Sequence, residues 1–397
     1  MRILITAVAC LSASGAVSCS SSADPQQAAG TLAPGRGSGG AEAGQTAEAG
    51  TGGAAATTPA PPAGSADTAG TNSQGSEGTT VVGLDNPDGS GGSGPARGGV
   101  TPDAGTLPPA QGSCPPGPFA ANPLPAGATP RPICTGMTFT EGAVWFQNLN
   151  TLFFSDFAIR DTASNFNGRI LSYTPGGQCQ EFIADAGTNG LAIGLDGSLL
   201  GARHRDQNLT RFDLTTKAAS VLVPDFGGAA FNSPNDIAVR SDGNLYFTDP
   251  SYMLGNRTSE LPMQTYRRDP SGALSVIDTA GNPNGITLAP DETHLYLSHL
   301  GGPNDVLVFD VDASGAVTNP QPFANVGSDG MAIDCAGNLY VTQGGVRVYD
   351  PSGNLLGTLA APGAANVAFG GPERKTLYIT ATTTLFAVEL DIPGLPY

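Results

Sequence analysis

Of the 397 residues, 56 are glycine, 33 are proline and only 13% are charged, and the formal net charge is −17. This acidic balance, with no run of Lys and Arg, excludes proteins that bind nucleic acid or anionic membrane surfaces through basic patches. All aromatic residues follow Cys114, and a segment without aromatics cannot bury enough apolar surface to offset its chain entropy. We therefore expect residues 114–397 to carry the fold and residues 20–113 to form a disordered linker.

The first residues have the form of an export signal. Met1-Arg2 supplies one positive charge, Ile3–Leu11 is mostly apolar, and small residues continue to Cys19. This run is too short to span a bilayer and predicts a signal peptide over residues 1–19. Ala16–Cys19 resembles a bacterial lipobox, which predicts an outer-membrane lipoprotein facing the periplasm or the surface, held by a lipid on Cys19. The alternative is plain secretion. The linker is interpreted as a tether, with an inert low-complexity tail as the alternative.

Four cysteines remain after the signal: Cys114, Cys134, Cys179 and Cys335. An even number of cysteines in an exported chain indicates disulfides, although four cysteines allow three pairings. Because Cys114 and Cys134 are close in sequence, we expect these two to pair.

A short motif recurs six times after Cys134. In each copy a carboxylate or an Asn stands just before a short apolar strand, and these residues lie 48, 46, 49, 45 and 37 positions apart. The six residues are Glu141, Asn189, Asn235, Asn284, Asp329 and Asn366. A spacing near 45 is typical of four-stranded propeller blades. The sequence therefore predicts an all-β fold, a six-bladed β-propeller.

The remainder of each repeat supports this prediction. Turns such as Asp196-Gly197 and Asp242-Gly243 follow the first strand and indicate hairpins, so their aspartates, like Asp291, are interpreted as turn residues. Trp145 falls inside a first strand and is expected in the core. The sixth repeat is one strand short, and we expect residues 115–139 to supply that strand and close the ring, which removes two exposed sheet edges.

In a propeller the first strands line the central channel, so the six repeated residues are expected at one mouth of it. Two carboxylates and four amide carbonyls are hard oxygen ligands that suit Ca²⁺ or Mg²⁺. Taken singly, an Asn-Gly pair is more often a simple turn. Six such positions in register favour a cation site.

The second strand returns to the same face, so its last residue is expected near the same mouth. The residues at this position are Asp156, Arg203, Asp249, His299 and Gln343, with His204 one step further on. We expect His204 and His299 at the rim of the pocket, and the alternative for both is a surface histidine with no role in the site.

Several motifs occur in order and carry a family resemblance. They are Thr140-Glu141-Gly142, Asn232–Asp236, Tyr246–Tyr252, Pro283-Asn284-Gly285, Ser328–Met331 and Ala368–Gly371. On these residues the chain resembles the superfamily of gluconolactonase, senescence marker protein and luciferin-regenerating enzyme. The resemblance implies a six-bladed propeller that binds a divalent cation and hydrolyses lactones, and related members hydrolyse phosphotriesters. It places the metal ligands on Glu141, Asn235, Asn284 and Asp329, and makes Asn189 and Asn366 channel-lining residues. His299 stands where the family often has Asp, which leaves the substrate open.

The resulting hypothesis is hydrolysis of a lactone with one divalent cation, foremost Ca²⁺, with Mg²⁺, Mn²⁺ or Zn²⁺ as alternatives. The cation would act as a Lewis acid. Asp329 is the first candidate for the general base, with His204 or His299 as a proton relay. Asn189, Arg203 and Asp249 are the candidate substrate contacts. The alternatives are a hydrolase of phosphotriesters or other esters, or a non-catalytic binding propeller with a structural calcium. We expect a monomer.

Overall fold

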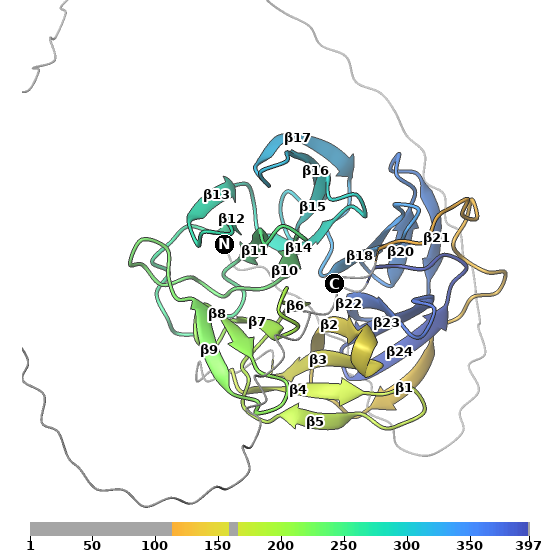
Figure 1. The fold of residues 1–397 in the computed structure, drawn as a ribbon, viewed down its shortest axis with the longest axis horizontal. Helices are drawn as coiled ribbons and strands as arrows, with labels where there is room; N and C mark the ends of the chain where they lie inside the picture. The colour runs from red at the N-terminus through yellow and green to blue at the C-terminus, as the bar shows by residue number, and fades with distance from the viewer. Residues whose placement is uncertain (1–112, 159–165, 396–397) are drawn as a thin grey trace, which may run out of the picture. The chain divides into compact units, whose positions relative to one another are not determined.

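The structure is a computed structural model and describes residues 113–158 and 166–395. These residues form six antiparallel sheets of four strands each, arranged around a central axis (Figure 1). The prediction of an all-β, six-bladed propeller is confirmed. The helical content of the described residues is the single 3-10 turn η1 (Gln147–Leu149), and none of their helices is long and apolar enough to cross a membrane. The predicted signal peptide at 1–19 and all but the last residue of the predicted linker at 20–113 lie outside the described residues.

The first five blades each use four consecutive strands, the first nearest the axis and the fourth at the rim. Blade 1 contains β2 (Thr140–Phe146), β3 (Thr151–Phe157), β4 (Gly168–Tyr173) and β5 (Gln180–Ile183). Blade 2 contains β6 (Leu191–Ile193), β7 (Leu199–Arg203), β8 (Asn208–Phe212) and β9 (Ala219–Val223). Blade 3 contains β10 (Ile237–Val239), β11 (Leu245–Asp249), β12 (Gln264–Arg268) and β13 (Leu274–Asp278). Blade 4 contains β14 (Pro283–Leu288), β15 (His294–His299), β16 (Asp305–Val311) and β17 (Val317–Ala324). Blade 5 contains β18 (Met331–Ile333), β19 (Leu339–Thr342), β20 (Val346–Tyr349) and β21 (Leu355–Leu359).

Blade 6 joins the two ends of the domain. Its inner strands are β22 (Ala364–Gly370), β23 (Thr376–Ala381) and β24 (Thr384–Glu389), and its outermost strand is β1 (Arg131–Thr135). β1 pairs with β24 in antiparallel register, with Arg131 opposite Ala387 and Thr135 opposite Thr384. The predicted closure of the ring by residues within 115–139 is therefore confirmed.

Hydrophobic side chains fill the gaps between neighbouring blades. Six buried clusters each combine residues of two adjacent blades, so that the described residues provide one cluster for every blade-to-blade interface. Between blades 6 and 1, Trp145 is fully buried and stacks on Tyr378 with ring centroids 5.4 Å apart. The predicted core position of Trp145 is confirmed. Each fully buried large side chain stabilises the ring by roughly 1.5–3 kcal/mol relative to an exposed one.

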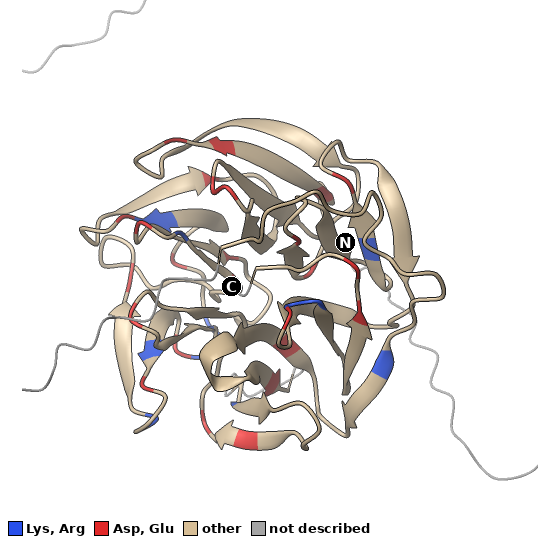
Figure 2. Cartoon of the chain, turned by 45° about the vertical axis from the view of Figure 1, so that its right-hand side comes forward, with Lys and Arg blue, Asp and Glu red and all other residues tan. Residues whose placement is uncertain are grey.

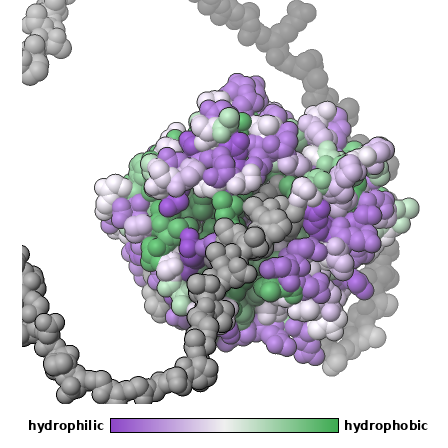
Figure 3. Space-filling model, viewed as in Figure 1, coloured by the Kyte–Doolittle hydropathy of each residue, from purple (hydrophilic) through white to green (hydrophobic). Residues whose placement is uncertain are grey.

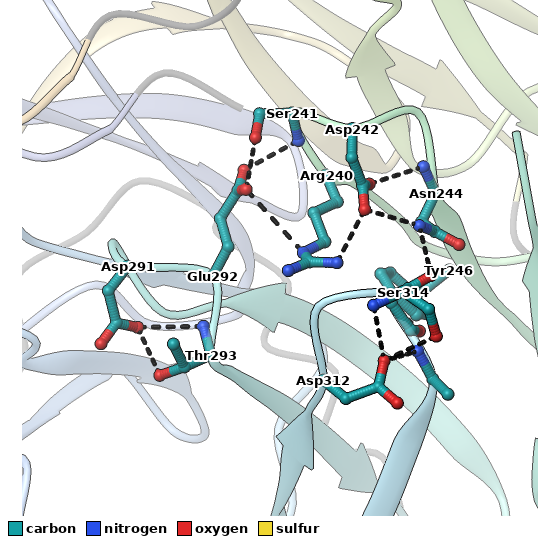
Figure 4. Close-up of polar contacts among 12 residues, drawn as sticks. Arg240, Ser241, Asp242, Asn244, Tyr246, Asp291, Glu292, Thr293, Asp312 and Ser314 are labelled. Carbon is teal, nitrogen blue, oxygen red and sulfur yellow. Dashed lines mark hydrogen bonds and ion pairs between the residues drawn. The ribbon is translucent and has the colours of Figure 1, made fainter.

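The hairpin turns at the far ends of the first strands are built on aspartates. Asp242 accepts a hydrogen bond from the backbone N–H of Asn244 at 3.0 Å, as Figure 4 shows. Asp196 and Asp291 accept the equivalent bond in blades 2 and 4. Glu292 also accepts from the backbone N–H of Ser241 at 2.8 Å and thereby joins the turns of blades 3 and 4. The interpretation of these aspartates as turn residues is confirmed.

The predicted pairing of Cys114 with Cys134 is wrong. The disulfides join Cys114 to Cys335 and Cys134 to Cys179. Cys134 lies in β1, next to the β4–β5 hairpin of blade 1, so its disulfide fastens the outer strand of blade 6 to that blade. The chain before β1 packs Leu124 on the core between blades 5 and 6, which carries Cys114 toward the turn after β18. Closeness in sequence was misleading because this segment crosses two blades.

Charged and apolar residues are distributed differently over the surface. Basic residues are scattered over several blades, among acidic ones (Figure 2). In the face that Figure 3 shows, hydrophilic residues dominate the periphery, and hydrophobic residues gather nearer the middle.

Candidate active site

A cavity of about 270 Å³ opens where the first strands of blades 1 to 5 begin. Five of the six repeated residues line it, and we call them the inner set: Glu141, Asn189, Asn235, Asn284 and Asp329. The sixth, Asn366, lines a narrower part of the channel together with Asp236. Its side-chain oxygen accepts the backbone N–H of Val367 at 2.8 Å. The structure thus brings the four predicted metal ligands and Asn189 to one cavity.

Glycines let the backbones of neighbouring blades approach at the axis. β2 has an irregular register between Glu141 and Val144, where Gly142 adopts a φ of 55°. A Cβ on Gly142 would overlap the backbone carbonyl of Asn189 in blade 2. In the same way, Gly190 donates its N–H to the carbonyl of Asn235 at 2.6 Å. The Glu-Gly and Asn-Gly pairs are therefore contacts between blades, and they are not hairpin turns.

Buried hydroxyls of the second strands support the inner set from behind. Ser155 donates to the carbonyl of Asn189 at 2.6 Å, and Ser298 accepts the N–H of Ser328, next to Asp329, at 2.6 Å. Equivalent hydroxyls stand in five blades: Ser155, Thr248, Ser298, Thr342 and Thr380. The sequence interpretation missed this function. The signal was present in these five blades, because the fourth residue of their second-strand motifs is Ser or Thr, whereas blade 2 has Ala202 there.

The carboxylates of the site are buried close to one another. Burial, with the charges of Asp329 and Asp236, raises the pKa of Glu141 well above its usual value. Burial raises the pKa of Asp329 to about 6 and that of Asp236 to about 7. Asp329 is oriented by Asn284, whose side-chain nitrogen donates to Oδ1 at 2.9 Å. A cluster of this kind is stabilised in its ionised form by a nearby positive charge.

The chemistry of this donor set fits a hard divalent cation. Glu141 and Asp329 offer carboxylate oxygens, and Asn235 and Asn284 offer amide carbonyls on the same cavity. Ca²⁺ and Mg²⁺ prefer such oxygens, and two carboxylates balance the charge of one divalent ion. Among the described residues, no group of three or more His, Cys, Asp or Glu is arranged around a metal position.

The polar residues that the repeat aligns near the ends of the second strands do not line the cavity; we call Asp156, Arg203, Asp249 and His299 the outer set. Asp249 is fully buried and accepts the backbone N–H groups of Asn232 at 2.9 Å and Ser233 at 2.8 Å. Burial raises the pKa of Asp249 to about 7 despite these bonds. Asp156 accepts the N–H groups that precede β2 in the same manner. Both carboxylates therefore hold the segments that lead into the inner set.

His299 is also fully buried and does not line the cavity, contrary to the predicted rim position. Its Nδ1 lies 2.8 Å from Asp305 and its Nε2 lies 3.0 Å from Asp278, so the ring connects blades 3 and 4. Burial lowers its pKa, but the hydrogen bonds and charges of Asp278 and Asp305 outweigh burial and raise it above the usual value.

His204 and Arg203 likewise face away from the cavity. His204 is fully buried with its ring 4.6 Å from that of Phe157, and burial lowers its pKa to about 3. Arg203 donates through Nε to the carbonyl of Ala186 at 2.7 Å and pairs with Asp206. The second strands return to the same face as predicted, but their ends are one strand further from the axis, so these side chains contact loops.

The ends of two second strands and neighbouring loops supply a wall that the sequence interpretation missed. We call it the apolar collar: Phe139, Phe157, Tyr252, Met253 and Leu300. Phe157 ends β3 and Leu300 directly follows β15, so these two hold equivalent positions of the repeat, and its register could have indicated them. The other three lie in connecting segments of blades 1 and 3, which no periodic signal covers.

Comparison with known proteins agrees with this geometry. The family model described as "SMP-30/Gluconolactonase/LRE-like region" matches residues 139–383. The chain belongs to this family. Its match spans all five residues of the inner set.

Individual relatives carry related names. A gluconolactonase of Zymomonas mobilis is 33% identical over 291 residues, covering 66% of this chain and 81% of that protein. Pentonolactonase XacC of Haloferax volcanii is 26% identical over 266 residues, covering 63% and 84%. The solved structure of XC5397 from Xanthomonas campestris, a gluconolactonase, is 29% identical with a TM-score of 0.61, covering 72% of this chain and 99% of that one.

Proposed function

We propose that this protein is a lactone hydrolase that uses one divalent cation, foremost Ca²⁺. The observation that carries the proposal is the convergence of Glu141, Asn235, Asn284 and Asp329 on one cavity. Membership of a family that includes a gluconolactonase at 33% identity supports lactones as the substrate class.

Glu141, Asn235, Asn284 and Asp329 would hold the cation, and a bound cation supplies Lewis-acid chemistry that polarises the ester carbonyl. In the overall reaction, water adds across the acyl C–O bond of the ring. The ring oxygen leaves as a hydroxyl group, and the new carboxylic acid releases a proton. Burial of the site limits the access of bulk water, which strengthens these electrostatic interactions.

We propose Asp329 as the general base. Its Oδ1 accepts from Asn284 at 2.9 Å, and its carboxyl group also hydrogen-bonds Glu141. We assign to its second oxygen the task of taking a proton from the attacking water. Asn189 lines the cavity and is proposed to donate a hydrogen bond to the substrate. Asp249, Arg203, His204 and His299 are proposed as supporting residues, because each is turned toward the protein.

The test is hydrolysis of a panel of lactones by the full-length protein, followed by proton release and corrected for spontaneous ring opening. Chelation should abolish the rate, and returning Ca²⁺ should restore it. A phosphotriester in the same panel separates the two kinds of ester. Lactone hydrolysis that persists unchanged in chelator contradicts the use of a cation, and no hydrolysis of any lactone contradicts the proposal as a whole.

We also propose that the chain is exported and attached through a lipid on Cys19. Two disulfides in the described residues suit an oxidising compartment. A Cys19→Ser variant should move from the membrane fraction to the soluble fraction, and a variant that stays with the membrane contradicts lipid attachment at this residue.

A further inference from the structure

We propose that the natural substrate is a lactone whose ring carries an apolar alkyl or aryl substituent, and that the apolar collar binds this substituent. The inference rests on the proposed lactone hydrolysis. It departs from the polyhydroxylated rings that the names of the relatives denote.

The apolar collar surrounds a floor of different chemistry. The floor is the inner set, with two carboxylates and three amides, whereas the collar contributes three aromatic rings, one thioether and one Leu side chain. A substrate that reaches the floor with its ester must therefore place its remaining atoms against apolar side chains. Burial of apolar substituent atoms there is favourable, and burial of unpaired hydroxyl groups is costly.

The collar does not belong to the core that holds the blades together. Phe157, Phe166 and Met253 form a separate buried cluster with Phe139 against it, outside the six clusters at the blade interfaces. The cluster joins segments of blades 1 and 3 at the cavity. Phe157 and Met253 are only 2% and 4% exposed, whereas Tyr252 is 41% exposed at the entrance. In the described residues, the wall between the entrance and the polar floor is thus formed by collar side chains.

Three described arginines near the collar are engaged elsewhere. Arg257 donates to the carbonyls of Met253 at 2.5 Å and His204 at 2.8 Å, which fixes the collar segment to blade 2. Arg203 bonds Ala186, and Arg205 pairs with Asp185 and Asp206. None of the three lines the cavity in the part of the chain that the structure describes. Among the described residues, a substrate hydroxyl or carboxylate therefore meets no guanidinium in the cavity lining.

The Tyr252 hydroxyl is already engaged. It donates to the carbonyl of Leu300 at 3.0 Å, which links the collar segments of blades 3 and 4, and it also hydrogen-bonds the Asn284 side chain. With Glu141, Asn235, Asn284 and Asp329 assigned to the cation, Asn189 and the Tyr252 hydroxyl are the described polar groups of the cavity left for the substrate. These two groups cannot satisfy the several hydroxyls of a sugar lactone, and unsatisfied buried hydroxyls weaken binding.

The experiment compares three five-membered lactones with the full-length protein and saturating Ca²⁺. They share one ring, which is unsubstituted, carries a five-carbon alkyl chain, or carries hydroxyl groups. We expect kcat/KM to be about 100-fold higher for the alkylated ring than for the hydroxylated one, given the free energy of burying methylene groups. Equal or higher kcat/KM for the hydroxylated ring overturns the inference and leaves lactone hydrolysis in place. No hydrolysis of any of the three overturns both.

Two variants keep the test specific to the collar. Leu300→Ser should lower kcat/KM about 10-fold for the alkylated ring, because it removes apolar contact, and should change the hydroxylated ring far less. If Leu300→Ser folds poorly, Phe139→Ser replaces it, and the same selective loss of kcat/KM for the alkylated ring is expected. Leu355→Ser is the matched control, since Leu355 is 55% exposed on β21 and does not line the cavity. A loss of equal size for both rings in the folded variants overturns the inference.

Discussion

The inner set and the outer set occupy equivalent positions of successive strands, yet they face different surroundings. Glu141, Asn235 and Asp329 face the cavity at the axis. Asp249 and His299 are fully buried and bonded to the protein around them. Adjacent strands are about 4.8 Å apart, and this one step decides whether a polar side chain meets the cavity or a supporting loop.

In this propeller, the residues proposed for chemistry lie at the axis, and the residues that support them lie one strand further out. Where the first strands begin, five blades place one polar side chain each on a shared cavity. One strand further out, the space between blades is occupied by connecting loops, so a carboxylate there accepts backbone N–H groups of its own blade, as Asp249 and Asp156 do. Substitutions in each set test this difference between the two positions.

The largest expected effect is that of Asp329→Asn in the inner set. We expect kcat/KM for a lactone to fall about 10³-fold, because the variant removes the proposed base and one cation ligand. The free energy of unfolding without cation should not fall, since a neutral amide replaces a buried carboxylate beside Glu141. Steady-state kinetics and urea unfolding measure the two effects. The matched control is Asp242→Asn, in a hairpin turn at the far end of a first strand. A kcat/KM of Asp329→Asn within 10-fold of wild type contradicts the assignment of Asp329 as base and cation ligand.

A smaller effect is expected from Asp249→Asn in the outer set. The carboxylate holds the N–H groups of Asn232 and Ser233, just before the proposed ligand Asn235. Residues that position metal ligands typically contribute about 10- to 100-fold to metal affinity or activity. We expect kcat/KM to fall within that range and to recover in part at high Ca²⁺ concentration. Complete loss of activity at every Ca²⁺ concentration would contradict a supporting role and indicate that Asp249 takes part in the chemistry.

His299→Gln should alter stability and its pH dependence more than activity. The pKa of His299 is raised in the folded state, so the stabilisation is fully present below the unfolded pKa of about 6.5 and is lost as pH rises through the folded value. At pH 6 we expect the variant to unfold with about 1–3 kcal/mol less free energy than wild type, a difference that shrinks toward alkaline pH. Urea unfolding at several pH values measures it. A constant difference across pH contradicts the charged pairing with Asp278 and Asp305.

The smallest effect is expected from Arg203→Gln. Arg203 bonds the carbonyl of Ala186 and pairs with Asp206, away from the cavity. We expect kcat/KM to change less than about threefold, which corresponds to well under 1.4 kcal/mol in the activation barrier. Kinetics at saturating Ca²⁺ test this, and a rise of KM by tenfold or more would show that Arg203 contacts the substrate.

The fold could be predicted from the sequence because it repeats. Each copy of the repeat independently indicated a four-stranded blade. The sixth copy lacked one strand, which had to come from residues before Glu141, and β1 is that strand. The inner set followed from the same register. The disulfides could not be predicted, since the chain between Cys114 and Cys134 crosses blades without any repeat.

Other parts of the site depended on information that the repeat does not contain. The directions of His204 and His299 are set by local partners, Phe157 for the first and two aspartates for the second. Phe139, Tyr252 and Met253 of the apolar collar come from connections whose lengths and sequences differ between blades, so that no register places Phe139 beside Met253 in advance.

Calorimetric titration of Ca²⁺ into wild type, Asp329→Asn and His299→Gln tests most directly whether the inner set, and not the outer set, binds the cation. We predict one site per chain in wild type, the same site with similar affinity in His299→Gln, and no binding in Asp329→Asn. Undiminished binding in Asp329→Asn, or its loss in a folded His299→Gln, would contradict the division of the two sets into chemistry and support.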